Sequence, residues 1–345
     1  MNKITTIITL LFVSIALVIL SETVILAKDV DKHISPKFDR VVSNMCKESA
    51  ELEPCDCTEP ISTEAFGEAS SDMKDVSYSL AFICRGSERE ISLEEYLVGV
   101  VMSEVPHTFE LEAIKAQAVA ARTYAIRELD SGTRHRGNAL CNDPSHCSAF
   151  ISKDEYISKY GEDEYEKAYT IVKRAVNDTD GEIITYNGEP CCAVYHSSSD
   201  GQTESSYNLW GTKTPYLMSV KSNEALNSSI VDIKESQMKK ILSCYGKIDA
   251  GKSEPIISYN DTGRCKSLSI FGITVSGKEA RTAFGLKSSD FTISYNNGIY
   301  TFNVKGYGHG IGLSQYGANE MAKSGHVYSE ILLHYYTGVT IDKIK

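Results

Sequence analysis

A carboxyl group on the apolar face of a predicted helix is the first candidate for chemistry. Glu104 follows Val101, Val100 and Leu97 by three, four and seven positions, so it shares their buried side. Burial without a strong cationic partner raises a carboxyl pKa and keeps a proton available for a leaving oxygen near neutral pH. The position alone also allows a helix-end glutamate that reaches solvent past Pro106.

An arginine occupies the matching inward position on the next predicted helix. Arg122 lies four residues after Ala118 and three before Ala125. Two inward ionisable groups on consecutive helices predict a polar cleft between the helices. The alternative is a buried structural salt bridge, which the spacing favours equally.

A loop that follows gathers nitrogen and sulfur donors, at His135, Cys141, His146 and Cys147. Zinc prefers these donors, and four of them would close a tetrahedral structural site. The alternative is a disulfide between Cys141 and Cys147 with both histidines exposed. The loop has few apolar residues to order it, which favours the metal.

Two further segments could bind a polymer. Residues 195–203 carry an imidazole, hydroxyls and an amide that suit the hydroxyls of a sugar, although such clusters often mark turns. No G-x-S-x-G elbow accompanies them, so serine hydrolysis is not indicated. Residues 306–315 are glycine-rich, but the spacing fails the G-x-G-x-x-G nucleotide fingerprint. The glycines instead favour close approach of backbone to an extended ligand, with His309 and Gln315 beside it.

The elements that position these residues are predicted to be of mixed α+β type. Ser92 and Glu95 form a capping-box pattern that opens a helix ending near Pro106, and Asn187-Gly188 suits a type I′ hairpin turn. The other predicted elements are a strand from Val76, helices over 111–129 and 163–176, a strand over 298–304 and two short helices before Gly338.

Charge and hydropathy limit the partners and the location. The formal net charge of −11 opposes binding to phosphate backbones, so nucleic acid is not an expected partner. Residues 1–27 are nearly uncharged after Lys3 and predict an uncleaved signal anchor, a cleaved signal peptide being the alternative. Residues 28–75 are polar and irregular and predict a stalk, which leaves residues 76–345 as the catalytic domain.

The motifs occur together in an order typical of one family. The segments YLVGVVMSEVP, KAQAVAARTYA, YHSSSDGQTES, LWGTKTPYL and GYGHGIGLSQYGA, with the Cys/His loop between the second and third, resemble the stage II sporulation protein D and amidase-enhancer family. The resemblance covers roughly residues 76–340. The Cys/His loop departs from the family pattern, which has a shorter gap between the cysteines and a glutamine where this chain has Ser148.

The resemblance implies an activity and a place of action. It implies lytic transglycosylation of peptidoglycan glycan strands, preferably strands without stem peptides, during forespore engulfment. The protein would act from the mother-cell membrane on the intermembrane space, with a cell-wall amidase or endopeptidase and a membrane protein of the engulfment machinery as partners. Glu104 would be the catalytic residue. Substrate-groove positions would be Arg122, Tyr195, His196, Ser197, His309, Ser314 and Gln315.

The chemistry agrees with one catalytic carboxyl group. A glycosidase that uses water needs a second carboxylate as base or nucleophile. A lytic transglycosylase can use the 6-hydroxyl of muramic acid as nucleophile, so we expect no second carboxylate in the groove. Two other functions remain open: a non-catalytic peptidoglycan-binding enhancer of an amidase, and a zinc-stapled adhesion domain.

Overall fold

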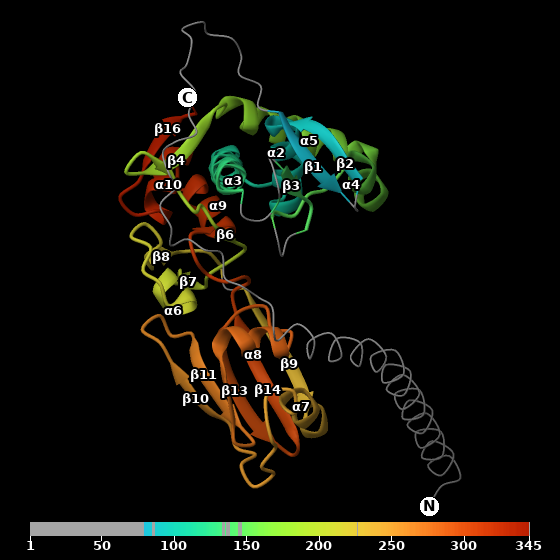
Figure 1. The fold of residues 1–345 in the computed structure, drawn as a ribbon, viewed down its shortest axis with the longest axis vertical. Coiled ribbons are helices and arrows are strands. Elements are labelled where there is room, and N and C mark those ends of the chain that lie inside the picture. Colours follow the sequence, from blue (N-terminus) through green and yellow to red (C-terminus); the bar gives the residue numbers. More distant parts are fainter. Residues whose placement is uncertain are drawn as a thin grey trace, which may run out of the picture.

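The structure is a computed structural model that describes residues 79–84, 87–132, 135, 139–143, 147–225 and 227–344. These residues form a larger body and a smaller lobe, which lies below the body in Figure 1. The predicted anchor and stalk, residues 1–75, lie outside the described residues. Within the described ranges, no helix has the length and apolar character to cross a membrane.

The larger body contains the sequence motifs and mixes helices with short strands. Its helices are α2 Leu93–Glu104, α3 Leu111–Ser131, α4 Lys153–Tyr160, α5 Glu162–Asp178, α6 Ser206–Trp210, α9 Gln315–Lys323 and α10 Tyr328–Tyr335. Its strands are β1 Ser79–Cys84, β2 Ser87–Ser92, β3 Ala139–Cys141, β4 Glu182–Tyr186, β5 Glu189–Pro190, β6 Tyr195–His196, β7 Gly201–Gln202, β8 Lys221–Ser222, β15 Leu313–Ser314 and β16 Thr340–Lys343. The predicted α+β class is confirmed.

Two features of these elements, the start of α2 and the turn between β4 and β5, occur where local sequence signals predicted them. The Ser92 hydroxyl accepts the backbone N–H of Glu95 at 3.1 Å and opens α2, which ends just before Val105 and Pro106. Asn187 and Gly188 have φ of 55° and 85°, as a type I′ turn between β4 and β5 requires.

Helix α3 is the centre of the larger body. It packs against α2, α5, α9, α10 and β4. Alanines on its opposite sides enter two separate hydrophobic cores, Ala118 and Ala121 in one, Ala116 and Ala120 in the other. Small side chains let neighbouring elements approach α3 from several directions, which explains its alanine-rich sequence.

The two predicted polymer-binding segments lie side by side. Strand β6 pairs in parallel with β15, so that His196 lies opposite Ser314. The backbone N–H of Tyr316 donates to the Ser197 carbonyl at 3.0 Å. The start of α9 is therefore fixed beside the segment that follows β6.

The smaller lobe is inserted into the larger body and has its own core. Its elements are β9 Ser228–Lys234, α7 Glu235–Leu242, β10 Ile256–Tyr259, β11 Cys265–Ile270, β12 Ile273–Ser276, α8 Gly277–Ala283, β13 Asp290–Asn296 and β14 Ile299–Lys305. They form two antiparallel sheets in the orders β10-β11-β12 and β13-β14-β9. The chain enters and leaves the lobe at one point, where Gly306 N–H donates to the Asn227 carbonyl at 2.7 Å. The sequence alone did not predict this subdivision of residues 76–345.

The loop between β10 and β11 fastens the lobe to the larger body. Buried Glu204 accepts from Asn260 Nδ2 at 2.7 Å and from Thr262 Oγ1 at 2.8 Å. Arg264 Nη2 donates to the Gln202 carbonyl at 2.7 Å and to the Ser199 carbonyl at 3.2 Å. Buried Glu204 and Arg264 thus find hydrogen-bond partners across the junction.

Arg122 is fully buried and joins three elements of the larger body. Its Nε and Nη2 donate to the two carboxylate oxygens of Glu94 at 3.3 and 3.0 Å. The remaining donors reach the carbonyl oxygens of Val176, Thr179 and Glu182 at 3.1, 2.8 and 3.2 Å. All five guanidinium N–H groups have an oxygen partner, an arrangement that the planar fork of arginine allows and lysine does not.

We expect Arg122→Ala to lower the free energy of unfolding by about 3–5 kcal/mol, because the change leaves buried carbonyls and Glu94 without their donor. Chemical denaturation of the wild type and the variant measures the difference. Arg174→Ala is the matched control, since Arg174 is exposed on α5 and pairs with Asp178 at 3.7 Å. That control should stay within about 0.5 kcal/mol of the wild type. A variant of Arg122 that keeps full stability and loses only glycan binding would contradict the structural role.

Candidate functional site

A cleft of about 450 Å³ lies where α2 ends, and Glu104 lines it. Ser197, after β6, and Gln315, the first residue of α9, line the same cleft. Three predicted site residues from distant parts of the sequence are therefore brought together. The parallel pairing of β6 with β15 places the last two next to each other.

Glu104 is held by two hydrogen-bond donors and lies largely away from water. Gln315 Nε2 donates to Glu104 Oε2 at 3.0 Å, and the backbone N–H of Ala149 also hydrogen-bonds to the carboxylate. Burial raises the pKa of Glu104 above its ordinary value, although both hydrogen bonds favour the charged form. A neutral amide and a backbone N–H orient the carboxylate without the strong effect that a cation would have. The raised pKa makes the protonated form that a general acid needs easier to reach than in a free carboxyl group.

The segment that carries Ala149 lies directly against α2 because of one glycine. Ile151 N–H donates to the Gly99 carbonyl at 3.2 Å, and the Phe150 ring covers Gly99. A Cβ atom at Gly99 would stand 2.1 Å from that ring. Any larger residue would push the segment away and withdraw the Ala149 N–H from Glu104.

Tyr195 lies close to this carboxyl group. Its hydroxyl donates to Ser148 Oγ at 3.1 Å. Burial, and next the negative charge of Glu104, raise the pKa of Tyr195, so its hydroxyl keeps its proton. Tyr195 can act there as a neutral hydrogen-bonding group.

Three other predicted substrate residues are built into the interior beside the cleft. His196 Nδ1 lies 3.1 Å from the Ile311 carbonyl and its Nε2 bonds the Ser199 hydroxyl. Buried Ser314 caps α9 by accepting Gly317 N–H at 3.2 Å and donates to Glu224 at 2.8 Å. His309 Nδ1 accepts Ile311 N–H at 3.0 Å. These bonds fix the shapes of the two loops.

Both histidines are neutral at physiological pH. Burial, followed by the neighbouring His309, lowers the pKa of His196 well below its ordinary value. Burial, followed by the positive charge of Arg281, lowers the pKa of His309 to about 4. Neither ring supplies a cation to the cleft. Arg122, buried elsewhere as described above, also does not line the cleft, and this placement agrees with the alternative of a structural salt bridge.

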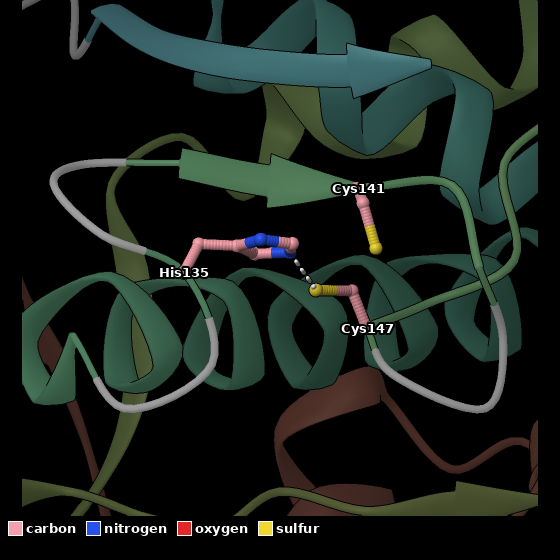
Figure 2. A group of neighbouring side chains, drawn as sticks. All are labelled: His135, Cys141 and Cys147. Carbon is pink, nitrogen blue, oxygen red and sulfur yellow. Dashed lines mark hydrogen bonds between the residues drawn. The ribbon is translucent and has the colours of Figure 1, made fainter. Parts of the chain in front are cut away.

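A nitrogen and two sulfurs gather around the loop that precedes Ser148 and Ala149, as Figure 2 shows. The ligand atoms of His135, Cys141 and Cys147 all lie within 4.8 Å of one another, and His135 Nε2 is 3.5 Å from Cys147 Sγ. Neither Cys141 nor Cys147 forms a disulfide, so the alternative of a disulfide between them is wrong. His146, the predicted fourth ligand, lies outside the described residues.

The cleft also has a wall that the sequence did not reveal. Aromatic rings of Phe109, Tyr156, Tyr160 and Tyr316 line it. In the sequence these residues look like ordinary apolar positions of helices or loops. Their spacing gives no sign that they line one cavity. Of these four, Tyr316 could have been inferred from the sequence, because it directly follows the predicted site residue Gln315.

A second carboxylate stands in the cleft, so our expectation that there would be none is wrong. Glu164 lines the cleft, and its Oε1 lies 3.0 Å from His107 Nε2. Lys167 Nζ is 3.5 Å from its other oxygen. In the sequence Glu164 is one of several acids in the first turn of α5, which is common where helix dipoles are compensated. Its ionic partners distinguish it from Glu104, whose hydrogen bonds come from uncharged groups.

The raised pKa of Glu104 predicts a pH-dependent effect on stability. The wild type loses stability as the pH rises through the folded-state pKa, because the carboxyl must then ionise in a buried place. Glu104→Gln removes this penalty, so it should be more stable than the wild type at neutral pH, with a difference that shrinks in acid. Denaturation curves between pH 4 and 8 measure this. Glu164→Gln, which removes an ion pair at the rim, should change stability by less than about 1 kcal/mol; a Glu104 variant with no such pH trend would contradict the assignment.

Comparison with known proteins gives the same family along most of the chain. The family described as Stage II sporulation protein matches residues 86–186. Stage II sporulation protein D of Bacillus amyloliquefaciens is 37% identical over 265 residues, which cover 74% of this chain and 76% of that protein. The protein of the same name from Bacillus subtilis (strain 168) shares the same identity and coverage.

A more distant relative has a different name. The amidase enhancer of Bacillus subtilis (strain 168) is 30% identical over 302 residues, which cover 71% of this chain and 40% of the enhancer. Both alignments are more than twice as long as the family match at residues 86–186. The chain belongs to the stage II sporulation protein D family.

Proposed function

We propose that this protein is a peptidoglycan lytic transglycosylase that cleaves glycan strands during sporulation. The observation that carries the proposal is the partly buried Glu104 carboxyl, which lines a cleft and is oriented by the Gln315 amide at 3.0 Å. Its raised pKa suits proton donation to a glycosidic oxygen. Membership of a sporulation family supports the cell wall as the place of action.

The proposed reaction uses Glu104 twice. Glu104 donates its proton to the glycosidic oxygen as the bond between that oxygen and C1 of muramic acid breaks. The 6-hydroxyl oxygen of the same muramic acid bonds to C1 and passes its proton to the Glu104 carboxylate. The products are a free hydroxyl on one sugar and a 1,6-anhydro end on the other, and Glu104 is protonated again. The Gln315 amide and the Ala149 N–H hold the carboxylate while it is charged.

Hydrolysis is the nearest competing reaction, because Glu164 also lines the cleft. A hydrolase would need Glu164 as base or nucleophile. The pair with His107 and the contact with Lys167 instead support a role at the rim. A second alternative is an amidase enhancer without glycan cleavage, which is the name that one relative carries.

The proposal includes a location and partners. Residues 1–27 would anchor the protein in the mother-cell membrane with the described residues outside the cytoplasm, and residues 28–75 would form the stalk. Partners would be a cell-wall amidase or endopeptidase, which would supply strands without stem peptides, and a membrane protein of the engulfment machinery.

The cluster of His135, Cys141 and Cys147 would hold zinc in a structural role. One imidazole and two thiols fit zinc, with His146 as the fourth ligand. Bound zinc would cross-link the loop rather than take part in the reaction. Cys147 is followed by Ser148, which accepts the Tyr195 hydroxyl, and by Ala149, which donates to Glu104. Ordering this segment would therefore support the catalytic carboxylate.

Product analysis of digested denuded glycan tests the reaction. Mass spectrometry should find 1,6-anhydro ends with the wild type, and Glu104→Gln should lower the cleavage rate by roughly 100- to 10,000-fold. Glu166→Gln, an exposed change on α5, is the control and should cleave normally.

Two results would point to the alternatives. Hydrated reducing ends alone, together with loss of cleavage in Glu164→Gln, would assign the protein to the hydrolases. Absence of any glycan product, with an amidase stimulated equally by the wild type and Glu104→Gln, would assign it to the enhancers.

Metal analysis tests the zinc site. Cys141→Ser should lose the roughly one zinc per chain expected of a closed structural site, and should have a lower Tm than the wild type. Cys84→Ser is the matched control: Cys84 is a free thiol at the end of β1, and its sulfur accepts from Asn142 Nδ2 at 3.4 Å. Equal zinc content in the wild type and Cys141→Ser would exclude this cluster as the metal site.

A further inference from the structure

Two tyrosines on the wall of the cleft expose much of their ring surface. Tyr160, the last residue of α4, is 50% exposed, and Tyr316, in the first turn of α9, is 44% exposed. Both line the same cavity as Glu104. Among the large hydrophobic side chains that the described residues expose, these two belong to the cleft.

We propose that Tyr160 and Tyr316 are stacking platforms for sugar rings of the glycan strand. The inference deepens the proposed function and rests on it for the identity of the ligand. A pyranose ring has an apolar face of C–H groups, and a flat aromatic ring can cover that face while its hydroxyl bonds a sugar hydroxyl. One platform comes from α4 and the other from α9, the helix whose first residue contacts Glu104.

Each exposed ring is supported from behind by another aromatic side chain. The Tyr160 ring lies 4.7 Å from that of buried Tyr156, measured between centroids. The Tyr316 ring meets Phe109 edge-on at 5.1 Å, and its own backbone N–H is bonded to the Ser197 carbonyl. Such support limits the rotamers of the free side chain, so less conformational entropy is lost when a sugar binds.

The charge of the cleft favours this mode of binding over ion pairing. The cleft is lined by two carboxyl groups, Glu104 and Glu164, and by one imidazole, His107, which Glu164 already contacts. No lysine or arginine is among the described residues that line it. Affinity for a glycan must then come mainly from hydrogen bonds and apolar contact, and should change little with ionic strength.

Binding to a variant that does not cleave isolates the platforms from the reaction. In the Glu104→Gln background, the Kd for purified denuded glycan strands is measured by calorimetry at low and high salt. Tyr160→Ala and Tyr316→Ala should each raise Kd by roughly 5- to 20-fold, with little dependence on salt. Tyr160→Phe and Tyr316→Phe keep the ring and should recover most of the affinity.

Tyr207→Ala is the matched control. Tyr207 is 56% exposed on α6 and does not line the cleft, so its removal should leave Kd unchanged. Unchanged Tm values for the alanine variants show that lost affinity is not lost folding. Where Glu104 is intact, the same alanine changes should raise KM more than they lower kcat.

The outcomes separate this inference from the proposed function. Alanine variants that bind glycan as tightly as their parent overturn the platforms, even if the wild type produces 1,6-anhydro ends. Weakened binding in the alanine variants supports the platforms, even if the wild type releases no product and the lytic reaction is therefore wrong. Affinity that collapses in salt while surviving both alanine changes would assign recognition to charged groups and overturn the inference.

Discussion

The buried guanidinium of Arg122 is the interaction on which the geometry of the larger body depends. It binds Glu94 at the start of α2 and the carbonyls of Val176 and Thr179 at the end of α5. It thereby fixes the first turn of one helix against the last turn of another. The opposite ends of these helices carry Glu104 and Glu164, both of which line the cleft. Separating the Arg122 charge from these partners would carry a large desolvation cost, so Arg122 holds α2 and α5 together although it does not line the cleft.

Three parts of the chain form the environment of Glu104, and a different physical cause places each of them there. The helix places the carboxyl on the apolar side of α2. The missing side chain of Gly99 lets Phe150 lie on the helix and brings the Ala149 N–H within reach. Gln315 arrives from α9, whose start is fixed by the pairing of β15 with β6. Two uncharged donors hold the carboxylate in place, while burial still outweighs them and raises its pKa.

The sequence predicted the features that depend on residues close together in the chain. The Ser92 cap and the turn at Asn187-Gly188 follow from residues a few positions apart, and the structure confirms them. The expected inward side of α3 is only part of its buried surface, since Ala116 and Ala120 on the opposite side are buried as well. The inward position of Arg122 was correct, but its partners lie on α2 and beyond α5, so spacing could not decide between a cleft and a salt bridge. The motif resemblance supplied the long-range links between Glu104, Ser197 and Gln315.

Features without a local signal could not be predicted. Glu164 looks like a residue that compensates a helix dipole, and only the packing of α5 beside α2 brings it to the cleft. Tyr156 and Tyr160 lie one turn apart on a short helix, as core residues commonly do. The inserted lobe was missed because its boundary is a junction between Asn227 and Gly306, two residues far apart in sequence. The place of Glu164, the place of the two tyrosines and the boundary of the lobe all depend on tertiary contacts between residues far apart in the sequence.

The inserted lobe affects the cleft through the loops to which it is hydrogen-bonded. Arg264 of the lobe bonds the Ser199 and Gln202 carbonyls, and a Cβ atom at Gly310 would stand 3.1 Å from its Nε. Ser199 lies two residues after Ser197, and Gly310 lies five before Gln315. Because the buried carboxylate of Glu204 anchors the same junction, separating the lobe would break several hydrogen bonds to a buried charged group. These bonds join the lobe to the two loops, so residues that lie outside the cleft contribute to the position of the Gln315 amide relative to Glu104.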